Sequence, residues 1–453
     1  MILKQSTYHL VDALSSSNLS DSSDGVRKVL FSSEISESLG EKVRPDFPVY
    51  QREDKARESL PLSYLDNAAT TQRLGSILKV MQEHYERSNA NPYRGIYRDS
   101  LLATAEYEQA RIEIADFVGA DPDEIIFTRN TTESINLVAY SYALEHLCPG
   151  DTVVLPISEH HSNMIPWQRV CSQTGAKLVY MELDEAGCLT QESLKVIDQH
   201  TKIVACAHVS NVLGTVFPLQ ELAQRAHQNG AVVIVDCAQS AAHLPLNFHE
   251  LDIDFAAFSG HKMYGPTGIG VLYVKRHVLA AMKPFLFGGE MVDSVWEHRA
   301  SFLTGPRRFE AGTPNIDGAL GLRCATRYLH NIGFDAVISH EKVLAKYLVE
   351  NLASFPQTRI LGNNTYSENR LGIVSFTIDS VDPHDVALFL DAQNVCIRTG
   401  SHCAQPLHRR LGVEQSCRVS LGIYNTKKDI DVFLDALEGL RNHVTRRIMG
   451  MFP

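Results

Sequence analysis

Lys262 is the residue of this sequence with the most evident chemical potential, because it lies in a short turn between two apolar segments. Residues 254–258 precede it and residues 271–274 follow it, which predicts a strand, a turn and a second strand. Phe258 and Met263 should partly exclude water from the amine, and burial lowers the pKa of an amine. A lysine with a free amine can form a Schiff base. Judged alone, a surface lysine in a turn is the more frequent case.

Asp236 is the second candidate, and it follows residues 231–235, which are apolar throughout. A carboxylate there is costly unless a cation pairs with it, and a protonated pyridine nitrogen would be such a cation. Gln239, three residues further on, could reach a neighbouring phenolic oxygen. A simple helix N-cap explains the aspartate equally well when it is judged on its own.

Two adjacent histidines, His160 and His161, follow another apolar segment, residues 152–156. A histidine in this place could stack on a flat ring or transfer protons. Metal binding and a capped turn are the alternatives. Adjacent side chains point in different directions, which argues against joint ligation of one metal ion.

Two further turns offer hydrogen-bonding groups. Thr131 and Thr132 stand where a strand leads into a predicted helix, and hydroxyls with backbone N–H groups at a helix N-terminus bind anions. Asn211 follows the apolar residues 203–207 and could bind a cofactor oxygen or a substrate carboxylate. Simple N-capping and an ordinary turn asparagine are the alternatives.

Together these turns supply an amine nucleophile, a carboxylate for a pyridinium, a histidine for ring stacking and an anion site. This is the set of groups that pyridoxal phosphate requires. The combination is more specific than any of its parts, so the sequence predicts a site for that cofactor.

A second group of reactive residues lies at residues 398–406. Cys403 is flanked there by glycine, histidine and arginine, so its sulfur should be accessible and its thiolate favoured by nearby positive charge. An incidental loop cysteine is the alternative. Arg418 could hold a carboxylate through two parallel hydrogen bonds, or it could form only a surface ion pair. Because no Cys-x-x-Cys pair accompanies these residues, we expect no metal site.

The elements that must position these residues alternate between strand and helix from Tyr64 onwards. Apolar segments predict strands at residues 124–128, 152–156, 177–180, 203–207, 231–235, 254–258 and 271–274, and helical patterns occupy residues 132–146 and 219–229. This alternation predicts an α/β fold with a mostly parallel sheet flanked by helices. Functional groups should then lie beyond the carboxyl ends of the strands.

Helices dominate after about residue 315. They are predicted at residues 316–331, 334–352, 383–392 and 428–447, around one strand at residues 372–378. We therefore expect three parts: an N-terminal extension of residues 1–40, a large domain of residues 63–315, and a small α+β domain formed by residues 41–62 and 316–453.

The N-terminal extension differs in composition from the rest of the chain. Residues 15–25 are rich in serine and aspartate, which is typical of a mobile linker, and short amphipathic segments flank them at residues 8–14 and 29–39. A disordered tail is the favoured interpretation. A segment that folds onto a docking partner is the alternative.

Composition argues against several classes of protein. The chain has 453 residues and a net charge of −11, which argues against nucleic acid or an anionic membrane as the main partner. No apolar run approaches the roughly 20 residues of a membrane helix, and the N-terminus lacks the layout of a signal peptide. The 9 scattered cysteines predict reduced thiols and a cytoplasmic location.

The sequence resembles the pyridoxal-phosphate-dependent cysteine desulfurases of the group II, SufS/CsdA-like type. The resemblance runs from about Val43 to the C-terminal helix and implies the fold-type I architecture of aspartate aminotransferase. The residues before Val43 have no counterpart in the family. The matching stretches are residues 64–69, 129–136, 159–163, 208–215, 235–239, 259–270, 308–315, 398–406 and 417–418.

The resemblance also implies roles for single residues. Lys262 would form the Schiff base, His160 would stack on the ring and act as acid and base, and Asp236 would pair with the pyridinium. Gln239 would contact the ring hydroxyl oxygen, and Cys403 would accept the sulfur. The phosphate would be bound by Thr131, Thr132, Ser259 and His261, and by Thr313 of the other subunit. The substrate would be held by Ala68, Asn211, Arg398 and Arg418.

The implied reaction converts L-cysteine into L-alanine and leaves the sulfur on Cys403 as a persulfide, for iron–sulfur cluster assembly or a related biosynthesis. A shared phosphate site implies a homodimer, and the short loop around Cys403 implies an acceptor protein of the SufE or SufU type. Two alternatives stay open: a selenocysteine lyase or related aminotransferase-type enzyme, and a desulfurase docked to a scaffold or shell through residues 1–40.

Overall fold

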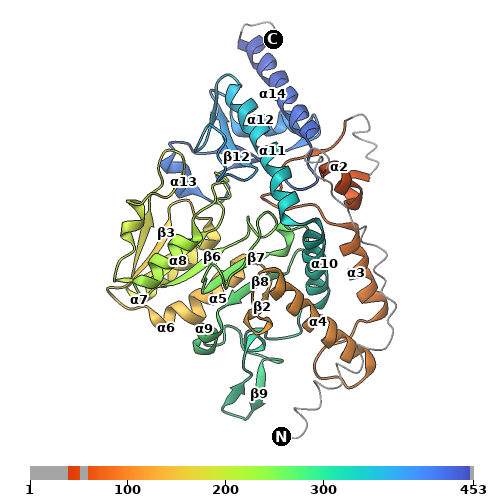
Figure 1. The fold of residues 1–453 in the computed structure, drawn as a ribbon, viewed down its shortest axis with the longest axis vertical. Coiled ribbons are helices and arrows are strands. Elements are labelled where there is room, and N and C mark those ends of the chain that lie inside the picture. The colour runs from red at the N-terminus through yellow and green to blue at the C-terminus, as the bar shows by residue number, and fades with distance from the viewer. Residues whose placement is uncertain (1–38, 52–59, 449–453) are drawn as a thin grey trace.

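The computed structural model describes residues 39–51 and 60–448 (Figure 1). The predicted N-terminal extension therefore lies outside the described residues, apart from its last two. These two, Leu39 and Gly40, begin helix α2 (Leu39–Val43). Whether the extension is disordered or docks to a partner stays a prediction.

A seven-stranded sheet with the strand order β2-β8-β7-β6-β5-β3-β4 forms the centre of the larger part of the chain. Its strands are β2 (Ile125–Thr128), β3 (Thr152–Pro156), β4 (Lys177–Met181), β5 (Thr201–Ala207), β6 (Val232–Asp236), β7 (Phe255–Ser259) and β8 (Gly270–Val274). The neighbours from β4 to β7 are parallel, and β8 runs antiparallel to both β2 and β7. Each predicted strand overlaps an observed one, so the mostly parallel sheet is confirmed.

Alternate side chains of this sheet enter two separate hydrophobic cores. Val271 belongs to the first core, which contains residues of α4 (Arg98–Phe117), α8 (Leu219–Gln228) and α10 (Ile316–Ile332). Leu272, the next residue, belongs to the second core, with residues of α5 (Thr131–Val138), α7 (Ile165–Thr174) and α9 (Arg276–Ala281). Successive side chains of a strand point to opposite faces, so helices cover both faces of the sheet. Further helices are α3 (Gly75–Arg87) and α6 (Leu144–His146), the latter preceded by a π-helical turn at Ala139–Ala143.

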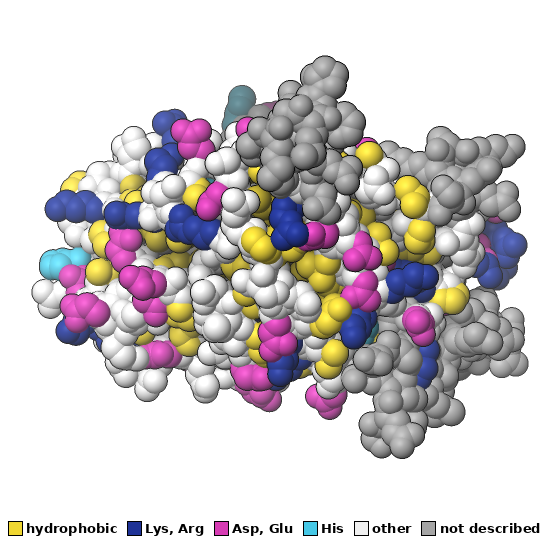
Figure 2. Space-filling model, turned by 90° about the horizontal axis from the view of Figure 1, so that it is seen from above, with side chains coloured by type: hydrophobic (Ala, Val, Ile, Leu, Met, Phe, Trp, Pro, Cys, Tyr) yellow, Lys and Arg dark blue, Asp and Glu magenta, His cyan; other side chains and the backbone are white. Residues whose placement is uncertain are grey.

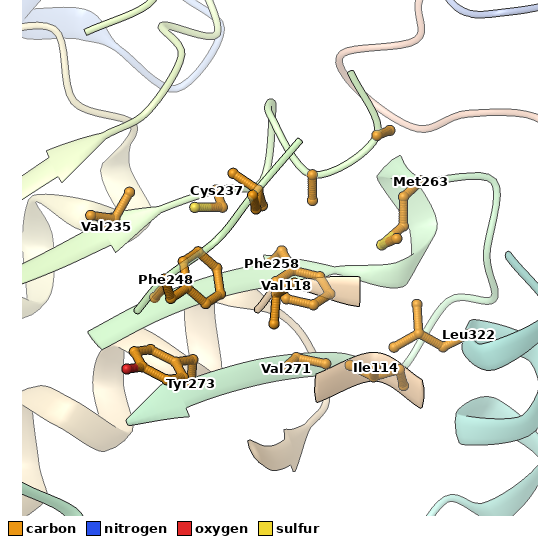
Figure 3. Close-up of a cluster of buried hydrophobic side chains, with 14 of the residues drawn as sticks. Ile114, Val118, Val235, Cys237, Phe248, Phe258, Met263, Val271, Tyr273 and Leu322 are labelled. Carbon is orange, nitrogen blue, oxygen red and sulfur yellow. The ribbon is translucent and has the colours of Figure 1, made fainter. Parts of the chain in front are cut away.

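The first core supports the end of β7, where the chain leads to Lys262. Phe258 and Val271 lie on the neighbouring strands β7 and β8, with Met263 just beyond the end of β7 (Figure 3). All three side chains are fully buried, at 0% exposure. Burying such a side chain contributes about 1.5–3 kcal/mol, so the lysine turn rests on a strongly stabilised base.

The C-terminal part contains a second sheet with the strand order β11-β12-β15-β14, in which all pairs are antiparallel. Its strands are β11 (Thr358–Ile360), β12 (Ile373–Ile378), β14 (Arg398–Gly400) and β15 (Ser416–Ser420). Its helices are α11 (Phe334–Ser354), α12 (Pro383–Asp391), α13 (Gln405–Arg410) and α14 (Lys427–Ile448). Figure 1 shows this sheet and α14 at one end of the molecule.

Two short pairs of strands lie outside these sheets. β1 (Ser63–Tyr64) is parallel to β13 (Val395–Cys396), which ties the start of the larger part to the C-terminal part. The hairpin of β9 (Val292–Val295) and β10 (Ala300–Phe302) projects from the end of the molecule opposite to the second sheet (Figure 1). The predicted domain boundaries remain a prediction.

Acidic and basic side chains are interspersed on the face of the molecule shown in Figure 2. In the part of the chain that the structure describes, no helix has the length and apolar character needed to cross a membrane. The expected absence of a nucleic acid partner stays a prediction.

Candidate active site

A cavity of about 240 Å³ lies beyond the carboxyl ends of β3, β5, β6 and β7, and loops of the C-terminal part complete its wall. Thr313 is exposed and is not among the residues that line it. The predicted residues that line the cavity are Ala68, Thr131, Thr132, His160, Asn211, Asp236, Gln239, Ser259, His261, Lys262, Arg398, Cys403 and Arg418.

Lys262 ends a 3-10 turn (Gly260–Lys262) that directly follows β7. Burial is the main cause that lowers the pKa of the amine, and the charge of Arg418 lowers it further. The carboxylate of Asp236 raises it, and the resulting pKa is about 8. The sulfur of Cys403 also raises this pKa, which is an electrostatic link between the two candidate reactive residues. An appreciable fraction of the amine is therefore uncharged near neutral pH.

Asp236 is the last residue of β6 and is 6% exposed. Burial raises the pKa of this carboxyl, whereas the N–H of Ala238, 2.9 Å from Oδ1, and the amine of Lys262 lower it. Gln239 is held beside it, because its Nε2 donates to the carbonyl of Ala68 at 2.8 Å. A buried carboxylate at the wall of a cavity favours a cationic ligand group.

His160 lies after β3, and its Nδ1 accepts a hydrogen bond from the N–H of Ser162 at 3.1 Å. The neutral ring therefore carries its proton on Nε2 and can donate from there. Burial is the main cause that lowers the pKa of His160 to about 3, and the charge of Lys262 contributes. The histidine is neutral in the pH range of most enzymes.

Sequence reasoning does not identify Glu159, yet this fully buried side chain anchors the turn that presents His160. Its Oε1 accepts from the N–H of Ala207 at 2.8 Å, and its Oε2 accepts from Nδ2 of Asn163 at 2.6 Å. Burial raises its pKa to about 8. The only signal in the sequence is a glutamate three residues after an apolar strand.

Hydroxyl groups gather where the start of α5 meets the end of β7. Oγ of Ser259 accepts from the N–H of Thr131 at 2.8 Å and lies 2.8 Å from its Oγ1. The hydroxyl of Thr132 contacts that of Ser162 at 2.8 Å. Burial lowers the pKa of the adjacent His261 to about 4. Hydroxyls and N–H groups at a helix N-terminus are the donors that bind a phosphate.

Arg418 lies on β15 and is 2% exposed. Its Nη1 donates to the carbonyl of Asn211 at 3.0 Å, and its Nη2 is 3.3 Å from Oδ1 of Asp66. The other oxygen of Asp66 is 3.3 Å from Nε of Arg398. Nε of Arg418 is buried without a hydrogen-bond partner, so this guanidinium retains a donor for a carboxylate.

Cys403 is exposed and belongs to a constrained loop. His402 and Cys403 have φ angles of 49° and 57°, a left-handed conformation that costs energy for residues other than glycine. The N–H of His161 donates to the carbonyl of Cys403 at 2.8 Å, and Nδ2 of Asn211 donates to that of His402 at 2.7 Å. Both donors come from turns that follow strands of the large sheet, so these bonds tie the cysteine loop to that sheet at the wall of the cavity.

A chain of hydrogen bonds also fixes the ring of His402. Nδ1 of His408 lies 3.1 Å from the carbonyl of Ala404, which can only accept, so Nε2 of a neutral His408 accepts from the hydroxyl of Ser416 at 3.0 Å. The same hydroxyl, 3.0 Å from Nε2 of His402, then accepts from that nitrogen. Nδ1 of His402 is left as a buried acceptor without a partner.

Residues 63–433 match the family model of the class-V aminotransferases. The chain belongs to this family. Within it, the chain is similar to the cysteine desulfurase of Haloferax volcanii, with 43% identity over 411 residues that span 88% of this chain and 96% of that protein. A probable cysteine desulfurase of Halalkalibacterium halodurans is 46% identical over 404 residues, or 89% of this chain and 98% of the relative.

Solved structures of cysteine desulfurases share the fold. The apo structure from Thermococcus onnurineus has a TM-score of 0.83 at 38% identity and covers 88% of this chain and 97% of its own. The structure of CsdA from Escherichia coli has a TM-score of 0.81 at 37% identity, with coverage of 90% and 98%. The chain is thus a class-V aminotransferase of the cysteine desulfurase type with a fold-type I architecture, as the resemblance implied.

Enzymes of this family depend on pyridoxal phosphate, and the cavity of this member fits the cofactor. Lys262 offers a partly uncharged amine. Asp236 offers a buried carboxylate, which interacts with the amine of Lys262. Thr131 and Ser259 line the cavity and offer hydroxyl groups to a phosphate. The donor set therefore suits all three polar parts of the cofactor.

Proposed function

We propose that this cavity converts L-cysteine into L-alanine and transfers the sulfur to Cys403, which supplies sulfur for iron–sulfur clusters or a related biosynthesis. The observation that carries the proposal is that Lys262 and Cys403, which are far apart in the sequence, line one cavity. The cysteine desulfurases named among the relatives support the same reaction.

The cofactor would be held by Lys262 at its aldehyde, by Asp236 at its ring nitrogen, by Gln239 at its ring hydroxyl and by His160 at its ring face. When bound, pyridoxal phosphate supplies an electron-withdrawing ring that makes the Cα proton of the substrate acidic. Lys262 would take up that proton, because burial keeps part of its amine uncharged. Asp236 would hold its negative charge next to the ring nitrogen.

The substrate carboxylate would be held by Arg418 and by Asn211, with Arg398 and Ala68 beside them. Nε of Arg418 is the buried donor that lacks a partner, and a carboxylate oxygen would satisfy it. Such an anchor places the side chain of L-cysteine relative to Cys403. The contact between Asn211 and His402 couples carboxylate binding to the cysteine loop.

The sulfur transfer needs a thiolate at Cys403. Its sulfur would attack the sulfur of the substrate, so that an S–S bond forms and the bond between sulfur and Cβ breaks. Cβ keeps the electron pair of that bond and takes up a proton, which leaves L-alanine. The sulfur remains on Cys403 as a persulfide.

The test of this function is turnover of L-cysteine by the Cys403→Ala variant. We expect alanine and sulfide release to fall by at least about tenfold under reducing conditions, while the absorbance of the bound cofactor stays. Wild-type turnover by this variant would contradict the role of Cys403. If the variant turned over only L-selenocysteine, the result would favour a selenocysteine lyase instead.

Two features of assembly belong to the same proposal. Thr313 is exposed and outside the cavity of its own chain, which suits the hypothesis that it binds the phosphate in the partner of a homodimer. The exposed Cys403 suits transfer of the persulfide to an acceptor protein of the SufE or SufU type. None of the 9 cysteines forms a disulfide, which supports a cytoplasmic location.

A further inference from the structure

A second cavity of about 240 Å³ shares no lining residue with the active site. Its apolar wall is formed by Val216, Leu244, Ile338 and Leu371. The polar residues that line it are Glu341, Lys342, Glu368, Asn369 and Arg370.

Arg370 is the feature of this cavity that needs an explanation. The residue is 4% exposed, and among the described residues its guanidinium makes one hydrogen bond, from Nη1 to the carbonyl of Asn363 at 2.5 Å. Its Nε and Nη2 are buried and have no hydrogen-bond partner. Among the ion pairs of the described residues, none includes Arg370. A buried guanidinium that lacks both a counter-charge and two hydrogen bonds is costly.

Two other buried arginines show how the chain normally compensates such a charge. Arg111 is 3% exposed and pairs with Glu310 and Glu108. Arg418 pairs with Asp66 and lines the active-site cavity. Arg370 forms no ion pair with any carboxylate of the described residues, and two of its guanidinium nitrogens have no partner.

The other charges around the cavity are already paired with each other. Glu341 lies 2.7 Å from Nδ1 of His243, whose pKa is raised by this carboxylate against the effect of burial. Lys342 is ion-paired with Glu368 at the exposed rim. Burial lowers the pKa of Arg370 to about 10, which still leaves it cationic at neutral pH. Of the charged residues that line the cavity, Glu341, Lys342 and Glu368 thus each have a partner, whereas Arg370 forms no ion pair among the described residues.

The two unpartnered nitrogens also define a geometry. Nε and Nη2 stand on the same side of a guanidinium, and their N–H bonds are parallel, so they match the two oxygens of one carboxylate. Beyond Arg370, the side chains of Val216, Leu244 and Ile338 offer apolar surface. Lys342, the other basic residue of the cavity, is paired with Glu368. Because Glu341 and Glu368 also line the cavity, a ligand with a single negative charge meets less repulsion there than a phosphate dianion.

We infer that this cavity is a binding site for a small organic monocarboxylate, held by two hydrogen bonds from Arg370 with its apolar part against Val216, Leu244 and Ile338. The cavity volume of about 240 Å³ admits a molecule of a few carbon atoms. The inference does not depend on the proposed reaction, because no residue of this site belongs to the active-site cavity.

The experiment titrates the cofactor-loaded full chain with sodium butyrate at constant ionic strength and follows the thermal unfolding midpoint. Sodium chloride, which lacks the organic anion, and 1-butanol, which has the apolar chain without the carboxylate, are the controls. A ligand that binds only the folded state stabilises it by RT ln(1 + [L]/Kd), so the midpoint rises with the logarithm of the ligand concentration once that concentration exceeds Kd. We expect this for butyrate alone. Arg370→Gln should weaken the apparent affinity by about tenfold or more, because two hydrogen bonds to a charged group are lost.

Three further variants separate this cavity from other sites. Ile338→Phe fills the cavity and leaves Arg370 in place, so it should abolish the effect even if Arg370→Gln does not fold. Arg418→Gln alters the active site and should keep the effect, as should Arg359→Gln, which changes an exposed arginine. The inference is overturned if butyrate raises the wild-type midpoint no more than sodium chloride or 1-butanol does, if Arg418→Gln abolishes the effect, or if Ile338→Phe retains it.

Discussion

The charge state of Lys262 results from opposing effects on one amine. Burial favours the neutral form, and the carboxylate of Asp236 favours the ammonium form. The outcome is a pKa of about 8, which lies well below that of an exposed lysine. The lysine can therefore act both as the amine that binds the cofactor and as a proton acceptor.

This balance predicts a pH dependence for cofactor loading. Only the neutral amine attacks the aldehyde of pyridoxal phosphate, so the loading rate of the cofactor-free protein should rise with pH and level off above about 8. Asp236→Asn removes the effect that raises this pKa, so its profile should shift to lower pH. Stopped-flow absorbance measures both profiles. A flat profile, or a shift of the variant to higher pH, would contradict the assigned balance.

Much of this residue-level chemistry can be predicted from the sequence, and some cannot. Lys262 and Asp236 each follow an apolar strand, and the ends of parallel strands meet at one edge, so local pattern is sufficient. The role of Glu159 depends on Ala207, which is 48 positions away in the sequence. The link from His402 through Ser416 to His408 likewise exists only in three dimensions.

At the level of elements, the turn after β3 depends on a buried network more than on local propensity. Glu159 joins this turn to β5 through Ala207 and joins it to α7 through Asn163, which accepts from Nε1 of Trp167 at 3.0 Å. His160 follows directly, so its position is set by these bonds.

Replacing Glu159 with alanine should therefore destabilise the protein and misplace His160. The change leaves two buried donors unpartnered, at a cost of about 1–3 kcal/mol each. Urea titration of the cofactor-loaded protein should show this loss, together with slower turnover. The control Glu192→Ala removes an exposed ion pair with Lys195 and should change stability by less than about 1 kcal/mol. Equal effects of the two changes would refute the anchoring role.

Several observed helices are missing from the sequence prediction. The strands of the large sheet are apolar runs and were identifiable, as were α10 and α11. Helices α3, α4 and α7 were not predicted. In α4 the buried positions include Ser100, Ala103 and Arg111, so much of its core-facing side is small or charged. The buried arginine is compensated by Glu310, which hydrophobic patterning cannot reveal.

At the level of the whole molecule, the active site joins segments from both parts of the chain, and the proposed homodimer adds Thr313 from a second chain. If the phosphate site is shared, a subunit with Lys262→Ala and a subunit with Thr313→Ala should complement each other. In the mixed dimer one site has both residues intact, and the other site lacks both.

Mixed dimers of these two variants should therefore recover tight cofactor binding and turnover at about half of the sites. Each variant dimer alone should be defective: the Lys262→Ala dimer in activity, and the Thr313→Ala dimer in cofactor affinity. Turnover at limiting pyridoxal phosphate measures the recovery, with unmixed variants as controls. If mixing restored nothing although mixed dimers form, Thr313 would not act across the subunits.

The central claim is that the sulfur freed with the help of Lys262 is received by Cys403. Mass spectrometry of the full chain after exposure to L-cysteine, followed by peptide mapping under non-reducing conditions, tests it most directly. The account predicts a gain of one sulfur atom on the peptide that contains Cys403, and no gain in the Lys262→Ala variant. Alanine formation with the added sulfur on another cysteine, or on none, would contradict it.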